Sequence, residues 1–417
     1  MKIKDIVTLV SKSITPQTGV IYNLYSLPSF DEGKTFEVLD GVDIQSNKYE
    51  VPDKCILFNK LNVRFKRVWR IDNHDENKIS STEFLPLVVN ENVVDIQYCY
   101  YLLISDKITN YLCGQNTNTS GSHKRIDPDN FLNIEINLPK MSIQKQIGKT
   151  LSTLDRKIEL NKQINDNLEA MARQLYDYWF VQFDFPDENG RPYKSSGGKM
   201  IYNEDLQLHI PEKWCICELK DYIISNNTGD WGYDTMSAEH PISVTCIRGA
   251  DILKLINLPH RYIKTKNVSK LLHPWNVVIE VSGGSPTQST GRCALITPGV
   301  LRRNGDKVTC SNFCHAFTLQ EDICSAYFYY TWKALYDNNN MFNYEGKTSG
   351  IKNFMTNMFL ANKWVVVPHD IMKSFFEKVK SIYTEIDNNI DEINSLSKQR
   401  DELLPLLMNG QATVNSD

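Results

Sequence analysis

Two stretches of the sequence carry apolar residues at alternating spacings of four and three. The first runs from Ser142 to about Trp179 and is interrupted by polar residues only at Asn161 and Asn165. Its apolar positions are Ile147, Leu151, Leu154, Ile158, Leu168, Ala172 and Leu175. This spacing predicts a long helix whose apolar stripe packs on a partner helix.

The second stretch lies near the C-terminus, from Phe375 to Leu407, and is interrupted at Asn389 and Arg400. Its apolar positions are Val379, Ile382, Ile386, Ile393, Leu396, Leu403 and Leu407. Each stretch extends over roughly eight turns, against about three for an average globular helix. We therefore expect an intramolecular coiled coil in which the polar positions set the register at some cost in stability. Two ordinary amphipathic helices in a globular core are the alternative.

The remaining sequence has short apolar runs separated by turn residues, a pattern that predicts a mixed α/β fold. The boundaries expected from these patterns are a first mixed domain at 1–140, a central long helix at 141–181, a linker at 182–210, a second mixed domain at 211–368 and a C-terminal long helix at 369–410. The linker is expected because its segment is rich in proline, glycine and serine.

The two mixed domains share short sequence pieces in the same order. Residues 3–5 resemble residues 219–221, residues 40–44 resemble residues 248–252, and residues 119–121 are identical to residues 348–350. The shift that aligns the last pair also places Asn133 on Asn362 and Pro139 on Pro368 without a gap. Since each half also ends in a long helix, we expect a tandem duplication. A duplicated chain can present two similar surfaces to a target with two half-sites.

The block from Leu151 to Met200, followed by residues 210–214 (IPEKW), resembles the specificity subunits of type I restriction-modification systems. The resemblance extends over nearly the whole chain and is most specific in this block. It implies two target-recognition domains, each reading half of a bipartite DNA target, separated by two helices that form an antiparallel coiled coil. It also implies a chain without catalysis of its own.

The partners that the resemblance implies are two methyltransferase subunits and motor-nuclease restriction subunits. The methyltransferase subunits would use S-adenosylmethionine to methylate adenine, and the motor-nuclease subunits would use ATP and Mg²⁺. No cofactor is expected in this chain itself.

Two acid-free stretches predict contacts with DNA. Between Asp53 and Asp72, cations alternate with Phe65 and Trp69. The candidates there are Lys60, Arg64, Lys66, Arg67 and Arg70. In residues 281–305 the candidates are Gln288, Ser289, Arg292, Arg302 and Arg303. Arg and Lys can neutralise phosphates, while Arg and Gln can pair with base edges. A solvated strand face and an ordinary loop are the alternatives.

A third candidate site is a pair of loops that occupy the same place in the two halves. Their candidate residues are Ser122, His123, Lys124 and Arg125 in the first half, and Lys347 and Lys352 in the second. Small residues beside these positions would let backbone N–H groups approach phosphate oxygens. A turn that the duplication copied is the alternative.

The end of the central helix is rich in aromatic residues. Tyr176, Tyr178, Trp179 and Phe180 are too apolar to be left in water, so this end must pack on the chain itself or on a partner. The resemblance favours the methyltransferase partner.

Bulk composition restricts the class of protein further. The chain is 41% hydrophobic and 23% charged, as soluble globular proteins are, and its net charge of -4 does not exclude local basic patches. The ten cysteines lack zinc-finger spacing, which predicts free thiols in a reducing compartment. Without a signal peptide or a run of 18 apolar residues, a cytoplasmic protein is expected.

Enzymatic alternatives rest on weaker motifs. Residues 346–348 (GKT) match the end of a phosphate-binding loop, but its first glycine is replaced by Met341. Asp187 with Glu218 and Lys220 has the form of a metal-dependent nuclease site. A DNA nuclease and a non-catalytic coiled-coil adaptor therefore remain alternatives to sequence-specific recognition.

Overall fold

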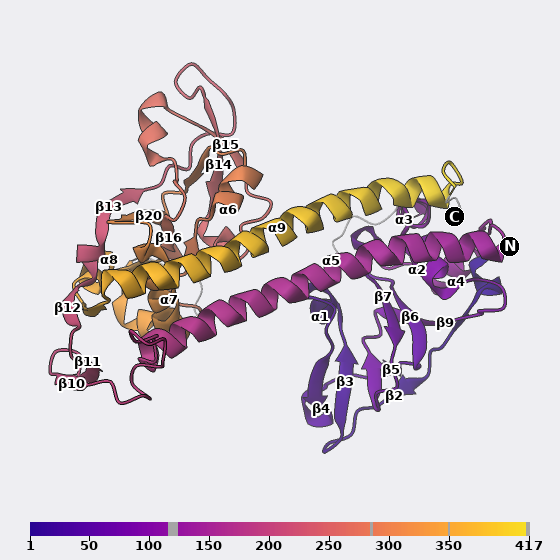
Figure 1. Cartoon of the computed structure of the whole chain (residues 1–417). Coiled ribbons are helices and arrows are strands. Elements are labelled where there is room, and N and C mark those ends of the chain that lie inside the picture. Colours follow the sequence, from indigo (N-terminus) through magenta and orange to yellow (C-terminus); the bar gives the residue numbers. More distant parts are fainter. Residues whose placement is uncertain (116–123, 284–286, 349–350, 414–417) are drawn as a thin grey trace. The chain divides into compact units, whose positions relative to one another are not determined.

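The structure is a computed structural model in which residues 1–115, 124–283, 287–348 and 351–413 are described. The chain divides into two compact units (Figure 1). Unit 1 comprises Met1–Glu159 and Asn394–Asp417, and unit 2 comprises Leu160–Ile393. Both units mix helices and strands, which confirms the predicted fold class.

Unit 1 contains two sheets. One has the strand order β1-β9-β6-β7, with β1 at Val7–Leu9, β9 at Phe84–Val89, β6 at Lys54–Asn59 and β7 at Val68–Asp72. The other has the order β2-β5-β8-β3-β4, with β2 at Ser13–Ile14, β5 at Lys48–Glu50, β8 at Lys78–Ser80, β3 at Ile21–Tyr25 and β4 at Glu37–Asp40. The helices are α1 (Leu27–Asp31), α2 (Ile96–Ile104), α3 (Asp106–Gln115) and α4 (Pro128–Leu132), with 3-10 turns η1 (Ile3–Asp5), η2 (Gly41–Asp43) and η3 (Val63–Phe65).

Unit 2 repeats this plan and adds to it. Its main sheet has the order β13-β20-β16-β18, at Ile223–Thr228, Cys314–Leu319, Val277–Glu280 and Cys293–Leu295. A second sheet has the order β15-β14-β19, at His260–Ile263, Ile242–Ile247 and Val308–Cys310. Smaller sheets are β17-β22-β21 (Ser282–Gly283, Ile351–Phe354, Glu345–Thr348), β12-β23 (Cys215–Glu218, Lys363–Val366) and β10-β11 (Met200–Asn203, Leu208–Pro211). The short helices are α6 (Pro298–Arg303), α7 (Cys324–Asp337) and α8 (Thr356–Leu360), with 3-10 turns η5 (Leu219–Tyr222), η6 (Gly249–Asp251), η7 (Thr265–Lys270) and η8 (Asn340–Tyr344).

The strand order confirms the internal duplication. The main sheets of the two units have the same order when β1, β9, β6 and β7 are matched with β13, β20, β16 and β18. In the second sheets, β4-β3-β8 matches β15-β14-β19, and the β3–β8 and β14–β19 pairs are both parallel. The short repeats seen in the sequence fall on η1 and η5, and on η2 and η6. At Gly41 and Gly249 a Cβ would lie 2.1 Å from Gln17 O and 2.7 Å from Glu280 Oε1, so close approach explains both glycines.

The central strand of each main sheet is buried on both faces. In β6, Ile56 and Phe58 belong to the core that contains α2, whereas Cys55 and Leu57 belong to a second core with Trp69. In β16, Val277 and Ile279 likewise face one core, and Val278 faces another. A run of consecutive apolar residues therefore forms a strand here because both of its faces are covered.

The long helices are α5 (Met141–Tyr176), continued by a π-helical turn at Asp177–Val181, and α9 (His369–Met408). In unit 2 the Asn161 amide donates to Glu392 Oε2 at 2.8 Å, and the Asn389 amide donates to Asn165 Oδ1 at 2.8 Å. As the residue number rises along α5, the residue number of the partner on α9 falls. The two helices are therefore antiparallel, which confirms the predicted coiled coil. In unit 1, Arg400 Nη1 donates to Asp155 Oδ1 at 2.9 Å. We call the line of contact between α5 and α9 the seam. Each polar residue that interrupts it thus has a polar partner.

The segment predicted as a linker contains the β10-β11 hairpin. Phe183, Phe185 and Ile210 are buried in the main core of unit 2, so much of this segment packs on that unit. All ten cysteines are free thiols. Within the described residues, no helix combines the length and apolar character needed to cross a membrane.

The Asn165–Asn389 pair gives a test of the seam. In the variant Asn165→Ala, the Asn389 amide, which is only 8% exposed, loses its acceptor. We expect the free energy of unfolding to fall by about 1–3 kcal/mol. Urea unfolding followed by circular dichroism measures this loss. The double variant Asn165→Leu/Asn389→Leu removes both polar groups and should recover it. A single variant as stable as the wild type would contradict the pairing.

Candidate nucleic-acid interface

The two acid-free stretches lie at equivalent places in the two units. Residues 60–67 connect β6 to β7, and residues 281–292 connect β16 to β18. Because β6 and β16 hold the same position in matching sheets, both connections leave the corresponding end of a central strand. The two stretches differ in composition but thus form the same structural feature, once in each unit.

In unit 1 the structure joins this connection to the third candidate loop. Leu61 and Arg125 form a β-bridge, and Asn62 N donates to Lys124 O at 2.8 Å. Ile126 N donates to Lys60 O at 3.0 Å. Lys124 and Arg125 therefore lie beside the first basic stretch. Ser122 and His123 fall outside the described residues.

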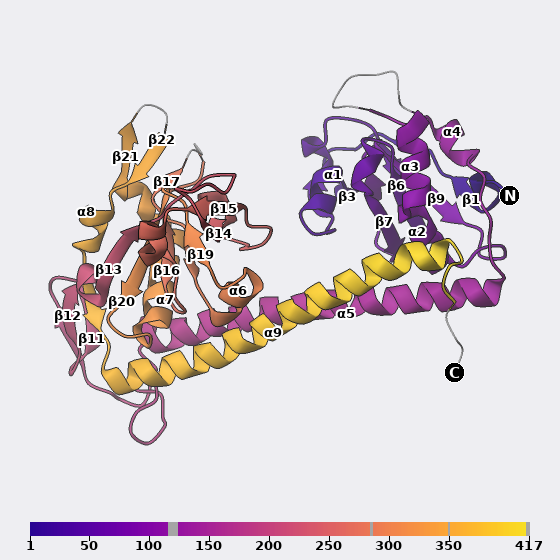
Figure 2. The same cartoon turned by 90° about the horizontal axis from the view of Figure 1, so that it is seen from above.

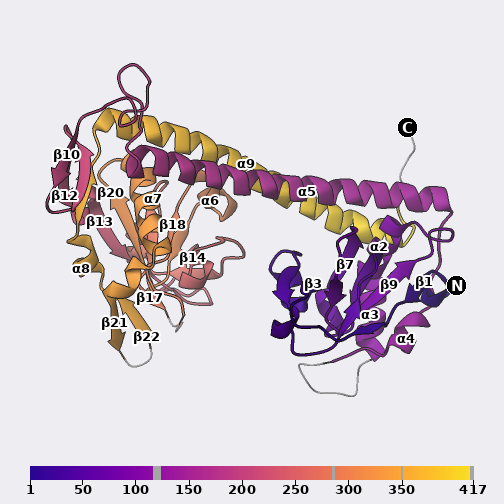
Figure 3. The same ribbon diagram turned by 90° about the horizontal axis from the view of Figure 1, so that it is seen from below.

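In unit 2 the equivalent joining occurs through β17 and β22. Ser282 pairs with Asn353, and Gly283 pairs with Lys352. Lys347 lies on β21, where its backbone pairs with that of Lys352. Figures 2 and 3 show β21 and β22 at the end of unit 2 that is remote from α5 and α9. Each unit thus builds its candidate site from two chain segments that are far apart in sequence.

Several cations of the unit 1 site have acidic partners. Arg67 donates to both carboxylate oxygens of Asp31, at 2.7 and 2.6 Å, and this hydrogen bonding lowers the pKa of Asp31. Lys66 pairs with Asp106 at 2.6 Å, and Arg125 pairs with Glu83 at 2.8 Å.

Three predicted cations of unit 1 have no ion-pair partner in the described part of the chain, namely Lys60, Arg64 and Arg70. Arg64 is exposed on η3. Lys60 directly follows β6 and is half-buried. Arg70 is exposed on β7, a strand that contacts α2, and so lies away from the loop. Arg64 is therefore the cation of this site most available to a phosphate.

The unit 2 loop is held together from inside. Arg292 donates to both oxygens of Glu280, at 2.8 and 2.6 Å, and this hydrogen bonding raises the pKa of Arg292. Glu345 accepts from Thr290 N at 2.7 Å and pairs with Lys352 at 3.0 Å. Ser289 is buried, and its carbonyl accepts from the Tyr336 hydroxyl at 3.2 Å.

These contacts correct part of the sequence prediction. The Arg292 and Glu280 side chains are 14% and 5% exposed, so Arg292 and Ser289 shape the loop and do not face solvent as direct DNA contact requires. Gln288 is exposed at the loop surface. The absence of acidic residues from 281–305 predicts cations without ion-pair partners. Their acidic partners instead lie just before this stretch or far along the chain.

Comparison with known proteins identifies the fold. A sequence model described as a type I restriction modification DNA specificity domain matches residues 1–170. The HindI type I restriction enzyme specificity subunit of Haemophilus influenzae is 35% identical over 129 residues, which span 31% of this chain and only 28% of that protein. The MjaIX specificity subunit of Methanocaldococcus jannaschii is 23% identical over 353 residues, or 81% of this chain and 74% of that one. The crystal structure of a type I S subunit from M. genitalium shares the fold, with a TM-score of 0.57 and 14% identity over 100% of this chain and 96% of that chain.

These matches support a specificity subunit of the type I restriction-modification systems. The predicted family is thereby confirmed. Such subunits are non-catalytic, and the nuclease alternative is not favoured.

The acids of the nuclease alternative have structural partners in this chain. Asp187 accepts from Arg191 N at 2.8 Å, and backbone hydrogen bonding lowers its pKa. Glu218 pairs with Lys220, and this hydrogen bond lowers the pKa of Glu218. No group of three His, Cys, Asp or Glu side chains that could hold a metal occurs among the described residues. Residues 346–348 lie on the strand β21 and do not lead into a helix, as a phosphate-binding loop would.

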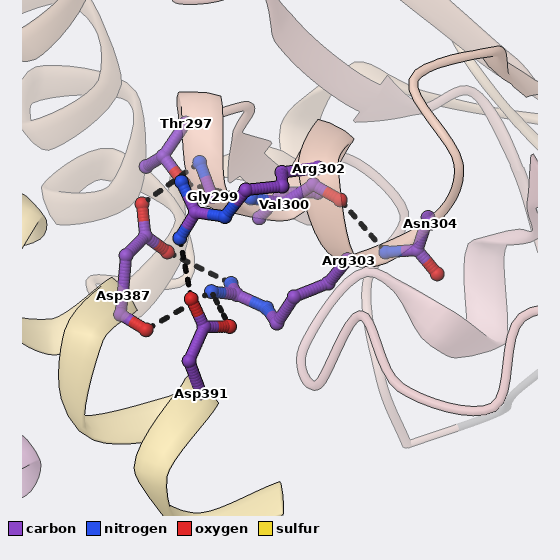
Figure 4. Close-up of polar contacts among 8 residues, drawn as sticks. All are labelled: Thr297, Gly299, Val300, Arg302, Arg303, Asn304, Asp387 and Asp391. Atoms are coloured by element: carbon purple, nitrogen blue, oxygen red, sulfur yellow. Dashed lines mark hydrogen bonds and ion pairs between the residues drawn. The ribbon is translucent and has the colours of Figure 1, made fainter. Parts of the chain in front are cut away.

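Arg302 and Arg303 attach α6 to α9 (Figure 4). Arg303 Nη2 donates to Asp387 Oδ1 at 2.8 Å, and Arg302 Nη2 donates to Asp391 Oδ2 at 2.5 Å. Gly299 N donates to Asp387 Oδ2 at 3.0 Å, and a Cβ on Gly299 would lie 2.1 Å from Asp387 Cγ. Arg303 is 15% exposed and does not face solvent as direct DNA contact requires, whereas Arg302 is 55% exposed and its contact with DNA stays a prediction.

The aromatic end of the central helix packs inside unit 2. Tyr176, Trp179 and Phe180 are 5%, 3% and 7% exposed, and the Phe180 ring centroid lies 4.8 Å from those of Tyr327 and Phe375. The prediction that these three residues bind a partner is therefore wrong. The aromatic-rich sequence of α7 was the signal that could have revealed their contacts. Tyr178 is 38% exposed, so its partner contact stays a prediction.

The α6–α9 contact gives a test with an internal control. The Arg303 and Asp387 side chains are 15% and 10% exposed, so Arg303→Met leaves a mostly buried carboxylate without its main cation. We expect the free energy of unfolding to fall by about 3–5 kcal/mol. In the control Arg302→Met, the broken pair is 55% and 38% exposed, and the loss should stay below about 1 kcal/mol. Urea midpoints compare the two. If Arg303→Met kept full stability but weakened DNA binding, the DNA-contact interpretation would return.

Proposed function

We propose that this specificity subunit reads a bipartite DNA target with the paired loops of its two units. One observation carries the proposal, namely that the same two-segment site occurs at the same strand end in both units. A protein that presents equivalent surfaces twice is suited to a target with two half-sites.

The two sites differ in the chemistry that they present. Unit 1 offers the cation Arg64, which can neutralise a phosphate or donate to guanine. Unit 2 offers the amide of Gln288 on a loop stiffened by the Glu280–Arg292 and Glu345–Lys352 pairs. Side-chain amides can pair with adenine in the major groove. Since the side chains differ at matching places, we infer that the two halves of the target have different sequences.

The subunit is also proposed to hold two methyltransferase subunits and the motor-nuclease restriction subunits, in the cytoplasm where the DNA is. S-adenosylmethionine, ATP and Mg²⁺ are assigned to those partners and none of them to this chain. In place of the buried aromatic end, the docking surface that we propose is an exposed apolar stripe on α5 and the π-helical turn that continues it. It consists of Leu160, Ile164, Met171 and Tyr178, which are 54%, 36%, 55% and 38% exposed. Its spacings of four, seven and seven residues suit a further helix.

Methylation-sensitive sequencing of host DNA tests the proposed function and its two-site form together. Deleting the gene should abolish adenine methylation at one split motif. Gln288→Ala should weaken discrimination in one half of that motif, whereas Arg64→Ala should lower methylation of the motif without changing which bases are preferred in the Gln288 half. A single mismatch typically changes affinity by about 1–3 kcal/mol, or roughly 5- to 150-fold. Methylation that does not respond to the deletion would refute recognition. An Arg64→Ala variant that changes base preference in the half affected by Gln288→Ala would refute the assignment of one half-site to each unit.

The docking stripe is tested by co-purification with the methyltransferase subunit. Leu160→Glu together with Met171→Glu places two charges on surface that a partner would desolvate, so we expect complex formation to be lost. Both positions are exposed, and stability of the isolated chain should change by less than about 1 kcal/mol. Lys162→Glu, on another face of the same helix, serves as the control. Full recovery of the complex with the double variant would exclude this surface.

A further inference from the structure

Phe65 is an exposed aromatic residue in the middle of the unit 1 site. Its side chain ends η3 and is 52% exposed. A single exposed apolar residue is common on protein surfaces and needs no explanation by itself. The surroundings of this ring are what distinguish it.

Two guanidinium groups flank the ring. The Cζ atoms of Arg64 and Arg67 each lie 4.8 Å from its centroid, within the range of cation–π attraction. Arg67 is fixed by its two hydrogen bonds to Asp31. Of the two cations that contact the ring, Arg67 is therefore held in place. Arg64 has no carboxylate partner among the residues that the structure describes.

The backbone on both sides of the ring is strained. Asn62 has φ 52° and ψ 59°, and Lys66 has φ 48° and ψ 42°, so two residues other than glycine adopt the left-handed conformation. Such residues cost on the order of 1 kcal/mol each and cluster at functional sites. Phe65 N donates to Asn62 O at 3.1 Å, and Lys66 N donates to Val63 O at 2.9 Å. Val63 is buried beneath the turn. The fold therefore holds this apolar ring outward on a closed turn.

We propose that Phe65 inserts its ring into the base stack of the half-site read by unit 1, while Arg64 binds the adjacent phosphate. This inference rests on the proposed function. Aromatic and apolar side chains recognise DNA by partly unstacking a base step or by stacking on a base, and nearby cations hold the backbone. An outward ring beside an available guanidinium supplies both parts.

The second unit provides an internal comparison. Its equivalent connection, residues 281–292, reads VSGGSPTQSTGR and contains no aromatic residue. The connection in unit 2 therefore has no counterpart of the Phe65 ring. The two halves should differ in how far the duplex is distorted, besides differing in sequence.

The test uses the full chain with its co-purified methyltransferase and duplexes that carry the methylated motif. 2-Aminopurine, whose fluorescence rises when its base is unstacked, replaces one base at a time in each half. We expect a rise in the unit 1 half only. Phe65→Ala should abolish that rise and weaken binding roughly 5- to 150-fold, while Phe65→Tyr should retain both. Tyr202→Ala, which removes an aromatic side chain that is 55% exposed on β10, is the matched control and should behave as the wild type.

The dependence of affinity on salt separates insertion from a role in holding Arg64. Arg64→Ala should make the slope of log K against log salt less steep by about 0.9, the value for one phosphate contact, whereas Phe65→Ala should leave it unchanged. If Phe65→Ala flattens the slope and no fluorescence rise occurs with the wild type, the ring only positions Arg64 and the inference is overturned. Phe65→Ala binding as tightly as the wild type overturns it as well. Wild-type protein without preference for the motif would instead refute the proposed function.

Discussion

The seam between α5 and α9 is the constraint on which both units depend. Unit 1 combines the first 159 residues with Asn394–Asp417 at the end of the chain, and its core contains Leu407, which is 4% exposed and clusters with Ile147 and Leu151. In unit 2, Ala172 and Tyr176 at the end of α5 share a core with Phe375 and Val379 near the start of α9. Each core therefore needs residues from both long helices, and neither recognition domain is complete before the last helix has folded onto it.

Polar residues on the same helices serve a second purpose, because they attach the domains to the coil. In unit 1, Asp155 accepts from Arg400 across the seam and from the Tyr101 hydroxyl of α2 at 2.5 Å. In unit 2, Asp387 of α9 accepts from Gly299 N and Arg303 of α6. One carboxylate in each unit thus satisfies donors from elements that are distant in sequence. Without these donors, either carboxylate would be an unpaired charge in a partly buried position. The loss of stability would be larger than that from breaking an exposed ion pair.

Spacing in the sequence was sufficient to predict the long helices, their polar interruptions and the duplication, because these features depend on periodicity and on order along the chain. Charge was a poorer guide to the site. The stretch 281–305 contains no acid, yet Arg292, Arg302 and Arg303 are matched by Glu280, Asp391 and Asp387. Ion pairs form between residues that are close in space, and a count of charges within the stretch misses Glu280, 12 positions before Arg292, and the two aspartates 84 and 89 positions after their arginines. The aromatic end of α5 is another case in which sequence distance hides the contacts, since its partners are on α7 and α9.

Few of the candidate DNA-binding residues lie at the surface without an internal partner, and they differ between the two units. Unit 1 keeps Arg64 and Phe65 on a strained turn, whereas unit 2 keeps Gln288 on a loop stiffened by two ion pairs. The sheets beneath the two loops have the same strand order, so the scaffold places little restriction on which side chains a loop presents. Substitutions in residues 60–67 or 281–292 can therefore change one half of a target while the buried strands β6 and β16 hold the loop ends in place. Under the proposed function, that separation of a shared framework from exchangeable loops would allow two copies of one domain to read two different sequences.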